Sequence, residues 1–193
     1  MIFKDYYCTF NDPFPKNFIA EIKKEGLANQ PKKASVGVLD KKKNTKIRNS
    51  KISWIKNPLI YDHTNPYIHK ANLLCNWNFE WDWNEAPQFT QYEQNNFYDW
   101  HVDTCTDPYS KGLQKGKLRK LSSILLLSEP GKDFEGGELE MDFDSCGGEG
   151  KKIVTELKKG TFIVFPSFVK HRVNPVTKGI RHSMVRSEEH TSE

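Results

Sequence analysis

The run Leu121–Leu127 is the feature that most limits how this chain can fold. It is too continuously apolar for a strand with one face in water, because such a strand alternates apolar and polar residues. We therefore expect a central strand covered on both faces, with helices on one side. Most of the sequence after residue 85 consists of short strand-like segments between turn residues, which is typical of a β-sandwich or barrel.

Two segments ahead of the strand-rich region have a helical pattern. The first is Pro15–Leu27, whose apolar side consists of Phe14, Phe18, Ile19 and Ile22. The second is Asn65–Trp81, with Asn65 as the N-cap and Pro66 in the first helical position. We expect its inner face to carry Leu73, Trp77 and Trp81.

Composition favours one folded domain without a membrane segment. The 193 residues are long enough for a substantial core, and no apolar run is long enough to span a bilayer. The N-terminus lacks the features of a signal peptide, so we expect a cytoplasmic protein. No Cys-x-x-Cys spacing occurs, which predicts free thiols at Cys8, Cys75, Cys105 and Cys146. The net charge of +4 is modest, and we expect no nucleic-acid partner.

The segment His101-Val102-Asp103 carries two side chains that suit a divalent metal. In an extended segment His101 and Asp103 point to the same face, while Val102 points away. His171 follows an apolar strand-like run and a Pro-Ser turn, and it can supply a third ligand. Two imidazoles and a carboxylate form the facial triad that holds non-haem Fe(II). Each signal is weak alone, but their joint order on strand-like segments indicates an iron site.

A cationic position follows the second histidine. Arg181 lies ten residues after His171, and Ser183 lies two residues further on the same face of the next strand. Taken alone, Arg181 is an ordinary surface charge. In this order, its planar guanidinium suits a carboxylate bidentately, and the neighbouring hydroxyl can complete the grip. The sequence thus indicates an oxygen-activating iron enzyme that uses an acidic cosubstrate.

The strand-like segments also form an ordered series of motifs. They are Ile47–Ile55, Phe89–Tyr92, Tyr98–Asp103, Arg119–Ser128, Phe134–Leu139, Gly160–Ser167, His171–Val176 and Gly179–Ser183. This series, over about residues 35–185, resembles the 2-oxoglutarate- and Fe(II)-dependent oxygenases of the prolyl 4-hydroxylase type. Collagen-type members usually carry Lys where this chain has Arg181, so the arginine favours the broader, often microbial or viral, branch.

The resemblance implies a fold and a domain organisation. The fold is mainly β with flanking helices: a double-stranded β-helix, that is, a cupin-like jelly roll of two facing sheets. One domain would cover residues 1–185, with helical support over about 1–85 and the catalytic core over about 86–185.

The resemblance also implies roles for single residues. In the family the His-x-Asp pair and the distal histidine bind iron, which gives His101, Asp103 and His171 here. The cation ten positions later holds the far carboxylate of 2-oxoglutarate, which gives Arg181. A tyrosine nine positions before the first ligand hydrogen-bonds the same cosubstrate, and in this sequence it is Tyr92.

The implied reaction uses Fe(II), O2 and 2-oxoglutarate, with ascorbate as an optional addition. It hydroxylates an unactivated C–H bond and releases succinate and CO2. The leading substrate is a prolyl residue of a peptide or protein, and the alternative is a free amino acid or other small metabolite. A non-catalytic, cupin-like metal-binding module is a third reading, but it needs neither Arg181 nor Tyr92.

Three further side chains have two readings each. Tyr98 and Trp100 are expected as exposed aromatics that line a peptide groove or fill the surface. Arg119 either contacts substrate or, as we prefer, forms an internal ion pair.

The last eight residues, 186–193, resemble the translation of a common sequencing-library adapter. We predict that they are a non-native tail outside the fold, because they interrupt the apolar strand begun by Ser183-Met184-Val185. Leaving out their one arginine and three glutamates raises the net charge from +4 to +6.

Overall fold

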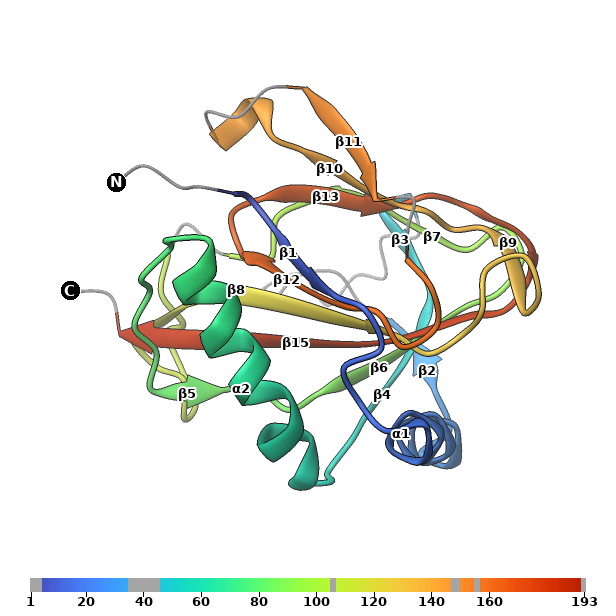
Figure 1. The fold of residues 1–193 in the computed structure, drawn as a ribbon, viewed down its shortest axis with the longest axis horizontal. Coiled ribbons are helices and arrows are strands. Elements are labelled where there is room, and N and C mark those ends of the chain that lie inside the picture. Colours follow the sequence, from blue (N-terminus) through green and yellow to red (C-terminus); the bar gives the residue numbers. More distant parts are fainter. Residues whose placement is uncertain (1–4, 35–45, 105–106, 147–149, 155–156, 192–193) are drawn as a thin grey trace.

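A computed structural model of the chain describes residues 5–34, 46–104, 107–146, 150–154 and 157–191. Its strands form a large sheet, a second sheet that faces it, and a short β9–β14 ladder (Figure 1). The order of the large sheet is β1-β12-β8-β15-β6-β4-β2, with β5 also paired to β15. The order of the second sheet is β11-β10-β13-β7-β3. The two facing sheets confirm the predicted double-stranded β-helix.

The elements have the following bounds. The strands of the large sheet are β1 Cys8–Phe10, β2 Lys32–Lys33, β4 Lys51–Trp54, β5 Trp83–Asn84, β6 Gln88–Tyr92, β8 Lys117–Leu126, β12 Phe162–Pro166 and β15 Arg181–Thr191. Those of the second sheet are β3 Arg48–Asn49, β7 Phe97–His101, β10 Leu139–Asp142, β11 Lys151–Val154 and β13 Lys170–Val173. The ladder consists of β9 Phe134–Gly136 and β14 Val176–Gly179, and the helices are α1 Lys16–Ala28, α2 Leu59–Leu74 and the 3-10 turn Asp144–Cys146.

Strand β8 lies inside the large sheet between β12 and β15, as its apolar run predicts. Leu121 and Leu125 enter a core that the helices share, whereas Ile124 and Leu126 enter a second core between the sheets. Each buried aliphatic side chain contributes about 1.5–3 kcal/mol to the free energy of folding. The run is therefore apolar because both faces of β8 are covered.

Helix α1 agrees with its predicted bounds to within one residue and buries Phe18, Ile19 and Ile22 against the large sheet. Gly26 lets the helix approach β6 closely, because a Cβ there would lie 2.2 Å from the ring of Phe89. Both helices cover the face of the large sheet that points away from β10 and β13 (Figure 1).

The predicted bounds of the second helix, Asn65–Trp81, are wrong. Helix α2 spans Leu59–Leu74, and Pro66 lies inside it. It starts earlier because the side chain of Asn57 accepts a hydrogen bond from the Leu59 amide. It ends earlier because Asn76 has a positive φ of 55°, a left-handed conformation that stops a helix. Leu73 is consequently 71% exposed instead of facing inward, while Trp77 is buried beyond the helix end.

β10 and β11 pair as an antiparallel hairpin. The prediction of free thiols concerns four cysteines. Cys8, Cys75 and Cys146 are free thiols, and Cys105 lies outside the described residues. Within the described part of the chain, no helix is long and apolar enough to cross a membrane.

The prediction that residues 186–193 stand outside the fold is wrong for residues 186–191. β15 continues through them to Thr191 and pairs with both β8 and β5. Main-chain hydrogen bonds continue the ladder whatever the side chains are. This places charged groups inside the protein: Arg186, Glu188 and Glu189 are all buried, and Arg186 pairs with Glu188 at 2.6 Å. The proposed origin of the tail stays a prediction.

Glu189 provides a test of this burial. Neither carboxylate oxygen has a hydrogen-bond partner among the described residues. Burial, followed by the neighbouring Glu85 carboxylate, raises the pKa of Glu189 from 4.5 to about 8. Between pH 4.5 and pH 8 the folded chain therefore keeps Glu189 protonated, whereas the unfolded chain releases that proton. This difference lowers the free energy of unfolding progressively as the pH rises from 4.5 to 8.

We expect Glu189→Gln to raise the melting temperature at pH 8 by about 2–8 °C, equivalent to about 1–2 kcal/mol. The substitution should change it little near pH 4.5, where wild-type Glu189 is largely protonated in the folded state. Thermal melts at both pH values measure this difference, with the exposed Glu135→Gln as the control. Equal shifts at the two pH values would contradict it.

Candidate metal centre and cosubstrate pocket

Two neighbouring strands of the second sheet bring the predicted metal ligands together. His101 ends β7, His171 lies in β13, and the two residues are direct partners in the antiparallel register. Asp103 follows β7 after one residue, and its backbone amide donates to the Ser167 carbonyl at 2.9 Å. Val102 is 45% exposed, so it points away from the pair as the His-x-Asp spacing predicts.

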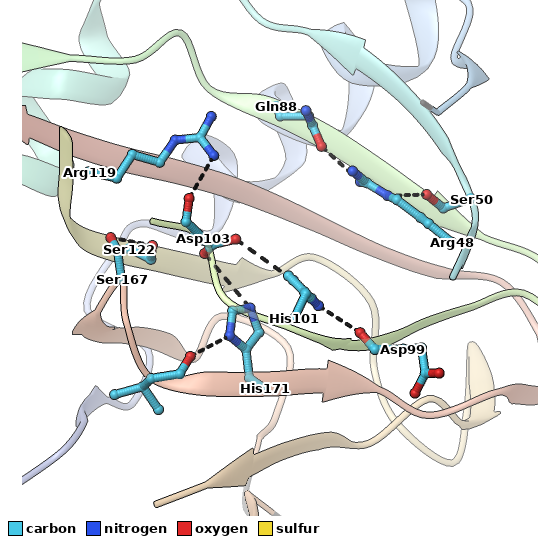
Figure 2. Close-up of polar contacts among 11 residues, drawn as sticks. Arg48, Ser50, Gln88, Asp99, His101, Asp103, Arg119, Ser122, Ser167 and His171 are labelled. Atoms are coloured by element: carbon cyan, nitrogen blue, oxygen red, sulfur yellow. Dashed lines mark hydrogen bonds and ion pairs between the residues drawn. The ribbon is translucent and has the colours of Figure 1, made fainter. Parts of the chain in front are cut away.

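The three side chains converge on one point (Figure 2). Asp103 Oδ1 lies 3.7 Å from His101 Nε2, and Asp103 Oδ2 lies 3.7 Å from His171 Nε2. One ligand atom from each of the three residues lies within 4.8 Å of the others. These separations are too long for hydrogen bonds, and they suit donors that share a central cation.

Backbone carbonyls fix the tautomer of both imidazoles. His101 Nδ1 lies 2.7 Å from the Asp99 carbonyl, and His171 Nδ1 lies 2.9 Å from the Val169 carbonyl. A carbonyl only accepts hydrogen bonds, so each Nδ1 carries a proton, and in the neutral ring Nε2 keeps the lone pair. Both Nε2 atoms face Asp103 (Figure 2). This second interaction of each ring is the arrangement that orients histidine metal ligands.

The electrostatics of the cluster keep it in the form that binds metal. Burial, and then the neighbouring His171, lowers the pKa of His101 to about 3, so its ring is neutral. Burial alone would raise the pKa of Asp103, but His171, His101 and Arg119 outweigh it and lower that pKa. His101 is therefore a neutral imidazole beside the Asp103 carboxylate.

Asp103 Oδ2 shows that the cluster fits a metal ion. It is buried without a hydrogen-bond partner among the described residues, and His171 Nε2 lies 3.7 Å from it. A buried carboxylate oxygen in that position costs free energy unless a cation completes its surroundings. Two imidazoles and one carboxylate suit Fe(II) with open positions. The site residues therefore fit a non-haem iron.

A cavity of about 240 Å3 joins the triad to the predicted cosubstrate residues. Tyr92 and Arg181 are direct partners on β6 and β15, and Ser183 lies two residues further on the same face. Arg181 is buried, donates to Ser183 Oγ at 3.2 Å, and lies 5.5 Å from the centre of the Tyr92 ring. All three residues line the cavity together with His101, Asp103 and His171.

Arg181 has room for an acidic ligand. Among the described residues it makes no ion pair, and its side-chain hydrogen bond goes to a neutral hydroxyl. Burial lowers its pKa, opposed by Tyr92 and Glu138. A buried guanidinium that lines a cavity without a carboxylate partner is suited to receive one from a ligand.

Sequence reasoning gave no role to Arg48, although the motif Ile47–Ile55 contains it. Arg48 lines the cavity, donates to Ser50 Oγ and Gln88 Oε1 at 2.9 Å each, and lies over the Tyr98 ring at 4.5 Å. Tyr98 is half-buried instead of exposed, because it stacks on His101 with ring centres 3.5 Å apart. Burial raises the pKa of Tyr98 to about 12. Trp100 is also half-buried, beneath Arg172.

Arg119 has the internal role that we preferred. It forms an ion pair with Glu85 at 2.7 Å and donates to the Asp103 carbonyl at 3.0 Å (Figure 2). Burial would lower its pKa, but Glu85 raises it. Arg119 therefore holds the backbone of Asp103 in place.

Fold and site together define a jelly-roll protein with a His-Asp-His centre beside a buried arginine. The profile of the 2OG-Fe(II) oxygenase superfamily matches residues 87–186, and the chain belongs to that family. A PKHD-type hydroxylase from Pseudoalteromonas atlantica is 35% identical over 113 residues, which are 55% of this chain and 47% of the relative. The chain thus spans about half the length of the curated relatives it matches.

Solved structures share the fold. A Pseudomonas putida prolyl-4-hydroxylase superposes with a TM-score of 0.69 over 96% of this chain and 93% of that chain, at 22% identity. A Trichoplax adhaerens prolyl hydroxylase, in complex with a hypoxia inducible factor peptide fragment, gives a TM-score of 0.64 at 15% identity, covering 95% and 83%. At these identities the likeness establishes the fold alone.

Proposed function

We propose that this chain is an Fe(II)- and 2-oxoglutarate-dependent dioxygenase that hydroxylates a prolyl residue of a peptide or protein. The observation that carries the proposal is the cavity shared by the His101–Asp103–His171 cluster and the buried Arg181, which makes no ion pair among the described residues. A mere metal-binding module needs no buried cation beside its metal. Membership of the oxygenase family supports the same chemistry.

His101, Asp103 and His171 would hold the iron. When bound, the metal would supply oxygen activation coupled to the decarboxylation of 2-oxoglutarate to succinate and CO2. The chain itself supplies geometry, because the Asp99 and Val169 carbonyls orient the two imidazoles. Arg119 and Ser167 fix the backbone on either side of the Asp103 carboxylate. Such support keeps ligands within the narrow tolerance that a catalytic site needs.

Arg181, Ser183 and Tyr92 would bind the far carboxylate of 2-oxoglutarate. The guanidinium offers a planar pair of donors, and the Ser183 hydroxyl and the Tyr92 ring lie beside it. The apolar side chains of Ile124, Val173 and Val185 line the same cavity. They reduce the access of water around the cosubstrate, which strengthens the charge-assisted contacts.

Several observations favour a peptidyl proline as the oxygen acceptor. The two solved structures described above are prolyl hydroxylases, one of them in complex with a peptide fragment. In this chain Arg48, Tyr98 and Trp54 line the same cavity as the cluster, and Trp54 is 48% exposed. Aromatic side chains that line a cavity suit the apolar ring of proline. A free amino acid or small metabolite is the alternative substrate.

The proposal is tested by incubating the Fe(II)-loaded chain with 2-oxoglutarate, ascorbate and a library of proline-containing peptides. Mass spectrometry should detect the gain of one oxygen on proline together with stoichiometric succinate. A parallel arm offers free amino acids, and oxygen gain there alone would favour the small-molecule alternative. Omission of ascorbate in a third arm tests its requirement. No 2-oxoglutarate-dependent succinate in any arm would refute the proposal.

Arg48 gives a prediction about the oxygen acceptor. Its two side-chain hydrogen bonds go to neutral groups, so the cation can also bind a carbonyl or carboxylate of the substrate. We expect Arg48→Ala to raise KM for the accepted substrate about tenfold or more, since a hydrogen bond to a charged group contributes about 1.5–3 kcal/mol. KM for the cosubstrate should not change. Steady-state kinetics with each substrate varied in turn measure both, and a rise confined to the cosubstrate would contradict this role.

A further inference from the structure

Arg181 separates two cavities. On one side is the cavity that contains the His-Asp-His cluster, and on the other is a second cavity of about 420 Å3. The second cavity has apolar walls, and the glycines of the turn after β9 line it. Its lining includes Leu126, Phe134, Gly137 and Leu139. The position of the guanidinium therefore depends on what supports the stem of Arg181 from this second side.

Gly137 is in contact range of that stem. A Cβ added to Gly137 would lie 3.0 Å from Arg181 Cδ and 3.0 Å from Val176 Cγ2. The Gly137 backbone cannot move away freely, because its amide donates to the Pro175 carbonyl at 3.1 Å. Any side chain at this position must therefore displace Arg181, Val176 or both by a few tenths of an ångström.

Displacement at Cδ matters because it lies close to the guanidinium. Arg181 is held by few directional contacts, its hydrogen bond to Ser183 Oγ being 3.2 Å long. A small shift at Cδ is carried to all the donor nitrogens. Bidentate recognition of a carboxylate tolerates an error of about 0.5 Å and 10–20°.

We infer that Gly137 is a positioning residue for the cosubstrate: its lack of a side chain leaves Arg181 where the guanidinium can bind the far carboxylate of 2-oxoglutarate. This inference rests on the proposed function. It assigns to Gly137 a role separate from that of Gly136, where a Cβ would lie 2.5 Å from the Pro175 carbonyl and would disturb the backbone itself.

The test compares two glycines that share one backbone property. Gly137 has φ +65° and Gly131 has φ +75°, so alanine strains both positions alike, but a Cβ at Gly131 meets nothing within 4 Å. Calorimetry on the Zn(II)-loaded chain, which does not turn over, measures 2-oxoglutarate binding. We expect Gly137→Ala to weaken it about tenfold or more and Gly131→Ala less than about twofold, because only Gly137 contacts Arg181. Zn(II) affinity should be the same in both variants.

A double-mutant cycle with Arg181→Ala isolates the contact. In the Arg181→Ala background, Gly137→Ala should leave 2-oxoglutarate binding unchanged. It should lower the melting temperature less than it does beside Arg181, because only the contact with Val176 Cγ2 remains. If Gly137→Ala alone does not fold, recovery of folding in the double variant supports the inference, and failure of both variants overturns it. Equal 2-oxoglutarate affinity for Gly137→Ala and Gly131→Ala also overturns it. Failure of the unmodified chain to bind 2-oxoglutarate instead refutes the proposed function.

Discussion

Asp103→Ala is expected to abolish stoichiometric Fe(II) binding and to remove 2-oxoglutarate turnover. The carboxylate is the single anionic ligand in the cluster and lies 3.7 Å from the Nε2 atoms of both histidines. Two neutral imidazoles alone bind a divalent cation weakly at a buried site, because no negative charge offsets its desolvation. We expect turnover to fall by at least about 100-fold, which corresponds to about 2.7 kcal/mol of barrier. Metal analysis of the purified variant and succinate release measure the two effects.

The matched control is Asp107→Ala, which removes an exposed carboxylate a short distance along the chain. It should bind iron and turn over normally. Thermal melting of both metal-free variants separates loss of metal from loss of fold. Full Fe(II) occupancy and turnover by a folded Asp103→Ala variant would end the assignment of this cluster as the iron site.

Arg181→Ala is expected to raise the concentration of 2-oxoglutarate needed for half-maximal turnover strongly, while Fe(II) binding persists. The substitution leaves the cosubstrate carboxylate in a buried cavity without its cation, a loss of about 2–5 kcal/mol, or roughly 30- to several thousand-fold. Arg181→Lys should recover part of the affinity, because it restores the charge but not the planar fork. Turnover measured across 2-oxoglutarate concentrations provides the values.

A surface cation near the same strand supplies the control. Lys178 lies on β14, and its side chain is 75% exposed in an ion pair with Glu135. Lys178→Ala should leave the 2-oxoglutarate requirement unchanged. If Arg181→Ala keeps the wild-type requirement, Arg181 does not bind the cosubstrate.

The residues of the candidate site were largely predictable, because the members of each pair lie close together in the sequence. His101 and Asp103 are two residues apart, as are Arg181 and Ser183, and this periodicity places both members of each pair on one face. Every residue that the sequence singled out for iron or cosubstrate lies in the metal cluster or lines the cavity. Arg48 was missed as a lining residue, because it carries no spacing signal toward the triad, and for Tyr98 the sequence left open a groove-lining or a filling role. Their positions depend on the pairing of β3 with β7.

The two wrong predictions concern helix α2 and strand β15, whose ends depend on residues outside the local sequence pattern. Asn65-Pro66 looks like a helix start, but α2 begins at Leu59 because Asn57 caps it and packing tolerates a proline inside. The last residues look too polar for a strand, but β15 continues through Arg186 and Glu188 between β8 and β5, which both pair with it. At β15, local residue preference loses to tertiary pairing.

By itself the sequence predicted the central position of Leu121–Leu127 and placed His101 with Asp103 and Arg181 with Ser183, because apolar patterning and residue spacing are local properties. The resemblance to the prolyl 4-hydroxylase type implied the class of fold and the candidate role of Tyr92. Only the tertiary structure decided that β7 and β13 are neighbours in register, so that His171 meets His101. It alone placed Gly137 against the stem of Arg181 and left Asp103 Oδ2 without a donor among the described residues. These contacts join residues far apart in the chain, and their distances are set by the packing of two sheets, which no single segment specifies.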